Sequence, residues 1–206
     1  MEVKRAERRT QAQRSASTRA TLVAAARTLF AAHGFGNVST QAVVAAAGVT
    51  RGALYHQFTD KSDLFVAVYE QVEAELVAEV AERLAERGTM GTLESMRTGA
   101  RLFLDLCAAP DVQRIVLVDA PAVLGWDRWR EVGARYGLGV IEAMLAAAIA
   151  DGTIPDQPVR AAAHVLLGAL DEAALYVSRA ADPDLARAEM YQVCDRLIAG
   201  LAQAIR

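Results

Sequence analysis

The sequence contains few cysteines, and their placement argues against several kinds of chemistry. Its 206 residues include two, Cys107 and Cys194, which lie in separate apolar, helix-like stretches without the spacing of metal ligands. We therefore predict two reduced, buried thiols, no metal site and no cofactor. No leader segment is evident at the N-terminus, so we expect a cytoplasmic protein.

Long apolar runs, alternating strand patterns and internal repeats are also missing. The longest strongly apolar run, residues 143–150, is far too short to span a bilayer. There is no nucleophile elbow and no glycine-rich phosphate loop. A triad could be drawn from Cys107, His164 and Asp119, but nothing in the sequence around them supports it. We therefore predict that the protein is not an enzyme.

Charge is distributed unevenly along the chain. Residues 1–61 contain nine Lys or Arg and three Asp or Glu, whereas residues 62–206 contain thirteen and twenty-two. A basic N-terminal segment on an acidic body indicates a localised surface for a polyanion. Charge alone is equally compatible with a basic tail that has no partner.

Apolar residues recur at intervals of three and four through most of the chain, which predicts an all-α fold of about nine helices. Residues 1–17 are polar and are expected to form a flexible basic arm. A first helix should run from about Thr18 to His33, where Gly34 can end it. Later helices are expected over about residues 61–87, 93–108, 110–119, 126–150, 158–180 and 183–206, with a kink or short turn at 121–125.

The most informative stretch lies between these, from Thr40 to Lys61. Two short helices separated by Gly48 leave room only for a tight, nearly perpendicular pair. Ser39 or Thr40 can cap the first of them, Thr50 the second and Asp60 the helix that follows. The outward faces are polar, so the second short helix could enter a DNA major groove with its N-terminal end first.

Sixteen residues in this region have a specific order and spacing: Leu29, Phe30, Gly34, Phe35, Thr40, Val43, Ala47, Gly48, Val49, Thr50, Gly52, Leu54, Tyr55, Phe58, Lys61 and Leu64. With them, the stretch from Leu22 to Val72 resembles the N-terminal domain of the TetR family of bacterial regulators. Two departures are Val44, where the family often has alanine, and Gln57, where many members have histidine. The resemblance implies a helix-turn-helix domain, placed at residues 18–62, and a helical effector-binding and dimerisation domain at residues 63–206.

The resemblance and the residue chemistry together give candidate DNA contacts. Arg51 can donate a bidentate pair to guanine or can contact a phosphate, and both roles stay open. Gly52 lets the backbone approach the groove, and Ala53 could touch a thymine methyl group. Thr50 lies beside Arg51 at the start of the recognition helix. The remaining candidates are expected at phosphates, with helix capping as the alternative for Ser39 and Thr40: Ser39, Thr40, Tyr55, His56 and Lys61. The arm residues either reach the DNA or stay solvated: Lys4, Arg5, Arg8, Arg9 and Arg14.

The last two long helices carry apolar stripes with the spacing of helix–helix seams. The resemblance implies that these helices pair with their symmetry mates. We assign the dimer interface to Leu166, Leu170, Ala173, Val177, Cys194, Leu197, Ile198 and Leu201. A monomer that uses these stripes for its own core is the alternative. A two-fold dimer would read two half-sites of a palindromic operator.

The resemblance also implies an effector pocket among the C-terminal helices. Its candidate lining is Phe103, Leu106, Cys107, Trp126, Trp129, Tyr136, His164, Leu167 and Asp171. Each aromatic residue has an ordinary core role as its alternative. Such a lining suits an apolar or aromatic molecule with a hydrogen-bonding group.

We therefore predict a homodimeric repressor that a small molecule releases from double-stranded operator DNA. The alternative is a DNA-binding regulator without a small-molecule effector, whose helical body binds a protein partner. A well-packed C-terminal domain would favour that alternative. Activation in place of repression also stays open.

Overall fold

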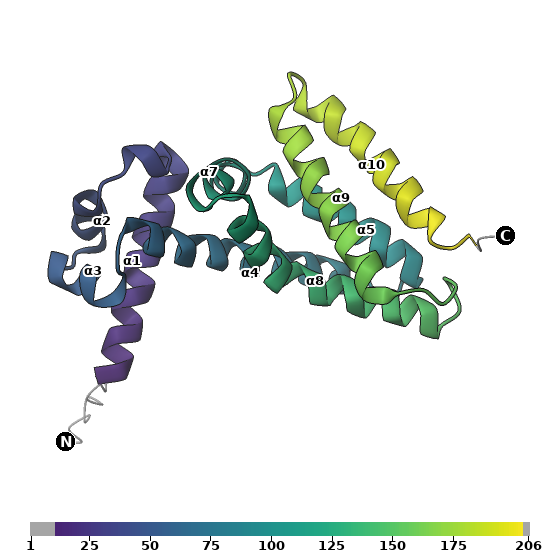
Figure 1. Ribbon diagram of the computed structural model, residues 1–206, viewed down its shortest axis with the longest axis horizontal. Coiled ribbons are helices and arrows are strands. Elements are labelled where there is room, and N and C mark those ends of the chain that lie inside the picture. The colour runs from purple at the N-terminus through teal and green to yellow at the C-terminus, as the bar shows by residue number, and fades with distance from the viewer. Residues whose placement is uncertain (1–10, 204–206) are drawn as a thin grey trace, which may run out of the picture. The chain divides into compact units, whose positions relative to one another are not determined.

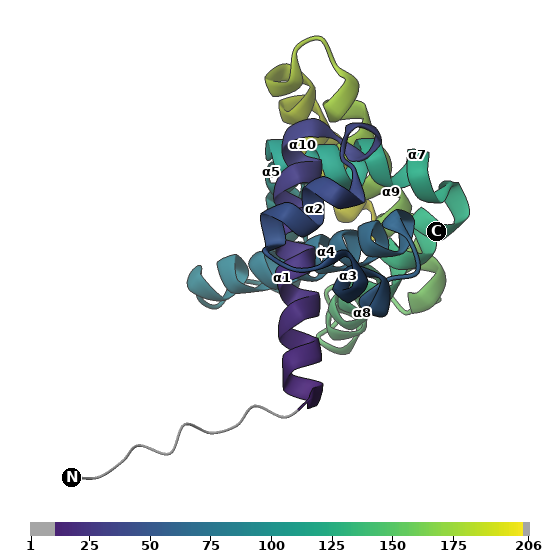
Figure 2. The same cartoon turned by 90° about the vertical axis from the view of Figure 1, so that its left-hand side faces the viewer.

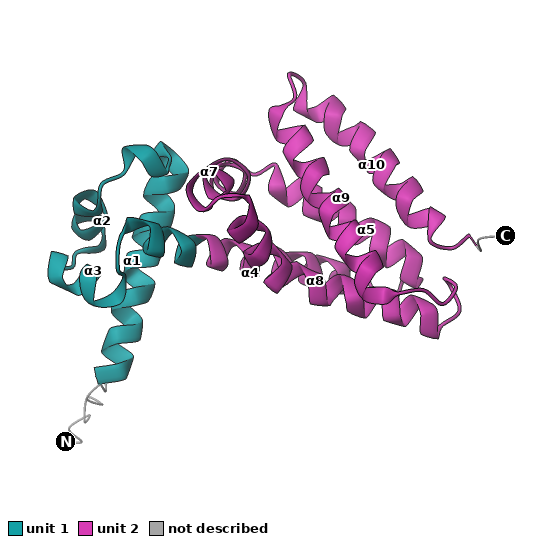
Figure 3. Cartoon of the chain, viewed as in Figure 1, with its two compact units in different colours: residues 1–68 teal, residues 69–206 magenta. Residues whose placement is uncertain are grey.

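The computed structural model describes residues 11–203, and every regular element in that range is helical (Figure 1). The expected all-α fold is confirmed. Nine helices are present in the described range when the continuous helical stretch 110–124 is counted once and a three-residue 3-10 helix is set aside. The chain divides into two compact units, residues 1–68 and 69–206 (Figure 3). The division therefore falls after Val68 and not after residue 62.

Unit 1 is a small helical domain built around aromatic side chains. Its elements are α1 (Gln11–His33), η1 (Phe35–Asn37), α2 (Thr40–Ala47), α3 (Arg51–Gln57) and the start of α4 (Lys61–Glu86). Both views place α2 and α3 against α1 (Figures 1 and 2). The rings of Phe30, Phe35 and Phe65 pack together, with centroids 5.2, 5.4 and 5.6 Å apart. This cluster joins α1, η1 and α4 into one core.

Helix α1 begins at Gln11, and not at about Thr18 as expected. Residues 11–17 lack apolar periodicity, but they also lack glycine and proline and so remain compatible with a helix. The side-chain amide of Gln57 donates to Ser15 Oγ at 2.7 Å, which connects this part of α1 to α3. The expected arm is therefore helical from residue 11 onward. Four of its candidate DNA contacts lie outside the described residues: Lys4, Arg5, Arg8 and Arg9.

The helix ends in unit 1 follow the predicted capping pattern. Ser39 Oγ accepts from the backbone N–H of Ala42 at 3.1 Å, and Thr50 Oγ1 accepts from that of Ala53 at 3.2 Å. Gly48 ends α2 in the left-handed region, at φ +64°. These local signals set the tight turn between α2 and α3.

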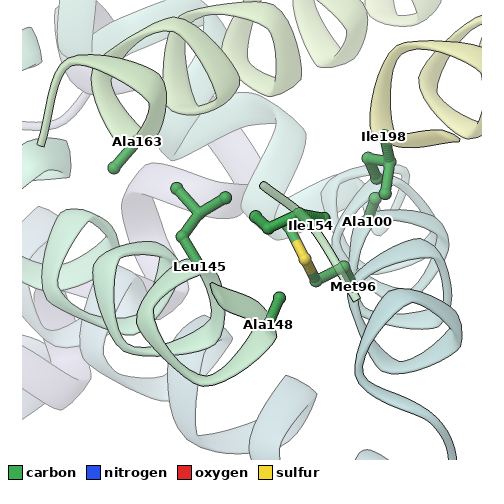
Figure 4. Close-up of a cluster of buried hydrophobic side chains, with 7 residues drawn as sticks. All are labelled: Met96, Ala100, Leu145, Ala148, Ile154, Ala163 and Ile198. Atoms are coloured by element: carbon green, nitrogen blue, oxygen red, sulfur yellow. The ribbon is translucent and has the colours of Figure 1, made fainter. Parts of the chain in front are cut away.

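Unit 2 is a larger bundle made from the rest of α4 and the C-terminal helices. These are α5 (Thr92–Cys107), α6 (Pro110–Val112), η2 (Gln113–Asp119), α7 (Ala120–Leu124), α8 (Trp126–Ala150), α9 (Val159–Arg179) and α10 (Pro183–Gly200). α8 packs against α9, and α9 against α10. A buried cluster joins α5, α8, α9 and α10 through Met96, Ala100, Leu145, Ala148, Ile154, Ala163 and Ile198 (Figure 4).

The expected kink at residues 121–125 is helical up to Leu124. Pro121 lies in the first turn of α7, directly after the π-helical turns of η2. Gly125, at φ +78°, then ends α7 and precedes α8. The region 110–124 is thus continuous helical chain, with π-helical turns in η2.

Two helices of unit 2 are long and apolar enough, by length and composition, to cross a membrane. They are α8 and α9. The sequence had suggested no such segment, because its longest uninterrupted apolar run is short. One or two helices of this kind are weak evidence for a membrane span, since core helices have the same composition. Here the two helices pack on each other, and several of their apolar side chains face the cavity described below.

Candidate DNA-binding surface and effector cavity

The exposed face of α3 carries the strongest candidates for DNA contact. Its inner side is fixed by Leu54, which is buried, and by Phe58, which follows the helix and is also buried. Opposite them, Arg51, Gly52 and Tyr55 are exposed to solvent. His56 is exposed as well, and Ala53 is half-buried. The sequence pattern identified the polar face of α3 correctly. A helix of seven residues has one buried side, so its apolar residues mark that side and the polar residues face solvent.

Thr40, Arg51 and Tyr55 lie together on this face. The Arg51 guanidinium carbon is 5.5 Å from the centroid of the Tyr55 ring. Hydrogen bonds with Thr40 and Arg51 lower the pKa of the exposed Tyr55 hydroxyl. The three side chains come from both α2 and α3, so their contacts connect the two helices of the helix-turn-helix at its surface.

Gly52 has open space where a side chain would stand. A Cβ added there would meet only the Thr50 hydroxyl within 4 Å, at 3.9 Å. The fold of unit 1 therefore does not require glycine at this position. The absence of a side chain matters for what approaches α3 from outside.

Three candidate contacts have roles inside the chain. Ser39 and Thr50 cap α2 and α3, as described above, and Lys61 holds the segment before α2. Its ammonium group donates to the backbone carbonyl oxygens of Phe35 at 2.9 Å and Val38 at 3.0 Å, and lies 4.0 Å from the centroid of the Phe35 ring. The predicted phosphate contact of Lys61 would have to use its remaining N–H.

One basic side chain near α3 was not selected from the sequence. The guanidinium carbon of Arg19, on α1, lies 5.0 Å from the centroid of the Phe58 ring. The apolar periodicity of residues 18–33 marks which face of that helix is buried. It gives no sign of which exposed arginine comes near the end of α3.

Unit 2 contains a cavity of about 360 Å³ enclosed by α4, α5, α8, α9 and α10. Its lining is apolar apart from Glu73, Asp171 and the thiol of Cys194. This combination of an apolar wall and a few polar groups is typical of small-molecule sites. Within residues 11–203, no group of three His, Cys, Asp or Glu side chains could hold a metal ion.

Three of the nine candidate lining residues face this cavity: Phe103, Leu167 and Asp171. Trp129 is buried elsewhere, and its indole N–H donates to the carbonyl oxygen of Val116 at 3.0 Å. Trp126, 56% exposed, packs on Trp129, and His164 faces solvent. The lining does not include Leu106, Cys107, Trp126, Trp129, Tyr136 or His164. Both cysteines are free and buried, as expected.

The α8 wall of the cavity is formed partly by glycines, which the sequence analysis did not select. Gly133 and Gly137 both line the cavity. A Cβ added at Gly137 would lie 3.3 Å from Leu167 Cδ1, so this glycine allows α8 and α9 to approach closely. The aromatic residues of α8 were selected because large side chains suggest a wall. In the structure, α8 borders the cavity partly through glycines, which have no side chain.

Glu73 is buried at one side of the cavity, with 8% of its surface exposed. Burial raises its pKa to about 7, against a hydrogen bond with Tyr69 that favours the ionised form. The single O–H of Tyr69 donates to the carbonyl oxygen of Trp129 at 3.1 Å, so it can serve Glu73 as a donor only by turning away from that carbonyl. The sequence contained a signal for this site, because Glu73 interrupts the apolar stripe that includes Leu76 and Val80.

Asp171 lies on the α9 side of the same cavity and has a cationic partner. The Arg130 guanidinium of α8 forms an ion pair with it. Burial raises the pKa of Asp171 to about 6, and Arg130 acts in the opposite direction. Glu73 and Asp171 therefore make one side of an otherwise apolar cavity acidic.

The residues predicted to form the dimer interface mostly pack inside their own chain. Ala173, Val177, Cys194 and Ile198 are buried, so they are not available to a second chain. Five of the eight predicted residues line the cavity: Leu166, Leu170, Cys194, Leu197 and Ile198. The large apolar side chains that α9 and α10 expose are Val165, Tyr176, Leu185, Val193 and Leu197, and of these Leu197 belongs to the predicted interface.

The architecture defines a class of protein: a helix-turn-helix domain followed by a helical domain with a ligand-sized cavity. Residues 22–68 match the family model described as bacterial regulatory proteins of the tetR family. Residues 93–201 match the model described as the tetracyclin repressor-like C-terminal domain. The chain therefore belongs to the TetR family and is a DNA-binding transcriptional regulator.

Individual relatives agree with this assignment. A crystal structure of a TetR-family transcriptional regulator from Pectobacterium atrosepticum is 33% identical, with a TM-score of 0.81, and the match covers 96% of this chain and all of that one. The transposon Tn10 TetC protein of Escherichia coli is 27% identical over 67% of this chain and 68% of its own. An HTH-type transcriptional repressor of Mycobacterium tuberculosis is 30% identical over 58% of this chain and 62% of its own length.

Proposed function

We propose that the protein is a cytoplasmic, homodimeric repressor that binds a palindromic operator and is released when a small molecule occupies the cavity of unit 2. The observation that carries this proposal is a single chain with an ordered, exposed polar face on α3 and a largely apolar cavity of about 360 Å³. The first feature suits DNA, and the second suits a small organic ligand.

The proposed dimer uses the outer faces of α9 and α10. Val165 on α9 is 71% exposed and Leu185 on α10 is 58% exposed, which are high values for large apolar side chains on two packed helices. Burying such side chains against a second copy would stabilise the pair by the hydrophobic effect. This face shares Leu197 with the stripe predicted from the sequence, whereas Ala173 and Val177 of that stripe are buried in their own chain.

The proposed release mechanism is a shift between two dimer conformations. Helix α4 starts in unit 1 and supplies Glu73, Leu76 and Val80 to the cavity of unit 2. A ligand that prefers one position of α4 therefore also favours one placement of the recognition helices. By linkage, DNA and ligand then weaken each other's binding by the same factor.

The alternative function is a regulator whose helical body binds a protein partner in place of a small molecule. That model was expected to have a well-packed C-terminal domain. The cavity in unit 2 supports the effector model over it.

Footprinting on the DNA upstream of the protein's own gene tests the DNA-binding part of the proposal. We expect a protected two-fold symmetric sequence that is lost in Arg51→Ala and Tyr55→Ala. Arg128→Ala is the matched control, because Arg128 is an exposed arginine of unit 2. If neither this DNA nor a selection from random sequences at low salt, where phosphate contacts are strongest, gives specific binding, the proposal is wrong.

The same variants can separate the two roles that stay open for Arg51. A guanine contact predicts that Arg51→Ala weakens specific binding by about 1–3 kcal/mol and relaxes the preference for one base pair. A phosphate contact predicts a uniform loss of affinity on all sequences. It also predicts that the slope of log affinity against log salt concentration becomes smaller by about one.

A further inference from the structure

The position of Glu73 gives information about the chemical class of the ligand. Its carboxyl group lines a cavity whose other walls are mostly apolar. The second acidic group there, Asp171, is already paired with Arg130. Among the described residues, no cationic side chain forms an ion pair with Glu73. An ionised carboxylate buried without a cation is strongly destabilised.

The Tyr69 hydroxyl can serve either form of the Glu73 carboxyl group, because its single O–H can point to Trp129 or to Glu73. Tyr69 is hydrogen-bonded to Glu73 and also donates its O–H to the Trp129 carbonyl oxygen. A protonated Glu73 can therefore donate to the tyrosine oxygen, which gives a continuous chain of donors and acceptors. The other charged groups nearby are Asp171 and Arg130, and the guanidinium of Arg130 is paired with Asp171 and not with Glu73.

The space next to Glu73 is open because the facing residue of α8 is glycine. A Cβ added at Gly133 would lie 4.0 Å from Glu73 Oε1 and 3.7 Å from the Tyr69 oxygen. A side chain at this position would fill the space beside the carboxyl group. The cavity thus has a place for a ligand group in contact with Glu73, and that group needs to be a hydrogen-bond donor or a cation.

An anionic ligand fits this cavity poorly. Its negative charge would stand beside two carboxyl groups, and the compensating guanidinium of Arg130 is not part of the lining. A neutral apolar ligand would fit the apolar walls, but Glu73 would still have no cation beside it. A cation would supply the partner that the site lacks and would permit Glu73 to ionise.

We propose that the ligand of this cavity is an amphipathic amine, whose ammonium group pairs with Glu73 and whose apolar part fills the space between α4, α5, α8, α9 and α10. This inference rests on the proposed function, because it names the class of effector that would release the repressor. Below the pKa of Glu73, about 7, binding of the cation releases the Glu73 proton to solvent, and above it the ammonium group meets a carboxylate that is already formed. In both cases Tyr69 can turn its hydroxyl toward the carboxylate.

Three probes with the same apolar tail and different head groups test the proposal: decylamine, decanol and decanoate. Calorimetric titration at pH 7.5 should give at least tenfold tighter binding for decylamine, which is then a cation, than for decanol, and the weakest binding for decanoate. Glu73→Gln should abolish the advantage of the amine and leave decanol binding within about twofold. Glu75→Gln is the matched control, because Glu75 is an exposed carboxylate of the same helix.

Binding of decanol or decanoate as tight as that of decylamine would overturn the inference. So would an unchanged preference in Glu73→Gln, or no binding of any probe. Operator affinity measured with each probe separates this failure from that of the proposed function. If a neutral or anionic probe binds and releases DNA, the repressor model stands and the amine assignment fails. If decylamine binds through Glu73 without changing operator affinity, the assignment stands and ligand-controlled release fails.

Discussion

The guanidinium of Arg130 on α8 forms an ion pair with the carboxylate of Asp171 on α9, beside the acidic wall of the cavity. Gly168 lies beside this pair, since a Cβ at that position would be in ordinary contact with Arg130 Nη2, at 3.6 Å. The pair therefore connects the two helices that pack along each other in unit 2. It also leaves Glu73 as the acidic group of the cavity without an ion-pair partner among the described residues.

Replacing Arg130 by methionine should destabilise the protein, because Asp171 would keep its burial and lose its cation. Both side chains are partly exposed, at 27% and 18%. We therefore expect a loss of roughly 2 kcal/mol at pH 8, less than the 3–5 typical of a fully buried pair. Urea unfolding of the wild type and the variant measures this loss in the free energy of unfolding. The double variant Arg130→Met with Asp171→Asn should recover most of the loss, and equal stability of wild type and single variant would contradict the prediction.

The stability of the protein should fall as the pH rises through the range in which Glu73 titrates. The unfolded chain releases this proton near pH 4.5, whereas the folded chain holds it until about pH 7. Between these values the folded state binds more protons, so the free energy of unfolding decreases with rising pH. The total effect is roughly 3 kcal/mol. Asp171, with a pKa raised to about 6, contributes in the same direction at lower pH.

Glu73→Gln has no titrating group at this site and should lose most of that slope. At pH 8 the variant should then be more stable than the wild type, by up to the same roughly 3 kcal/mol. Chemical unfolding at several pH values between 5 and 8.5 measures the difference. Glu75→Gln, with an exposed carboxylate replaced, should keep the wild-type slope. A Glu73→Gln profile parallel to the wild type would show that Glu73 is ionised throughout this range.

The helix-turn-helix could be predicted in detail because its signals are local. Ser39, Gly48 and Thr50 act on the backbone within three residues of their own positions, through capping and the left-handed turn. The buried and exposed sides of α3 follow from its few residues alone. Lys61 is the exception, since its carbonyl partners at Phe35 and Val38 are distant in sequence.

The C-terminal unit could be predicted only as a set of helices. A stripe with intervals of three and four residues shows that a face is buried, but not whether it is buried in its own chain or in a partner. This is why Ala173 and Val177 were assigned to the dimer interface, although they pack inside unit 2. The cavity depends on which glycines of α8 face the other helices, and that requires the three-dimensional packing.

Gly52→Ala should separate the stability of unit 1 from DNA binding. The fold has room for the added methyl group, and alanine is favoured over glycine within a helix by roughly 0.5–1 kcal/mol. Thermal unfolding should therefore show equal or higher stability, whereas operator binding should fall at least tenfold because the methyl group lies between α3 and the DNA. Gly139→Ala, at an exposed helical position of unit 2, is the control that should leave operator affinity unchanged. Undiminished binding by Gly52→Ala would mean that α3 does not approach DNA through this residue.

Val165→Glu should convert the proposed dimer to a monomer. Val165 is 71% exposed in the single chain, so the glutamate meets solvent there and the helical content should not change. In a dimer formed through α9 and α10, the same substitution places two unpaired carboxylates in an apolar interface, where burying a charge is unfavourable. Sedimentation equilibrium should therefore give half the mass of the wild type. Operator affinity should fall at least tenfold, because a monomer reads one half-site. Binding of decylamine should persist, because Val165 does not line the cavity.

Val118→Glu makes the same change at an exposed valine of η2, and this control should remain a dimer. A dimeric Val165→Glu would place the interface on another face of the protein.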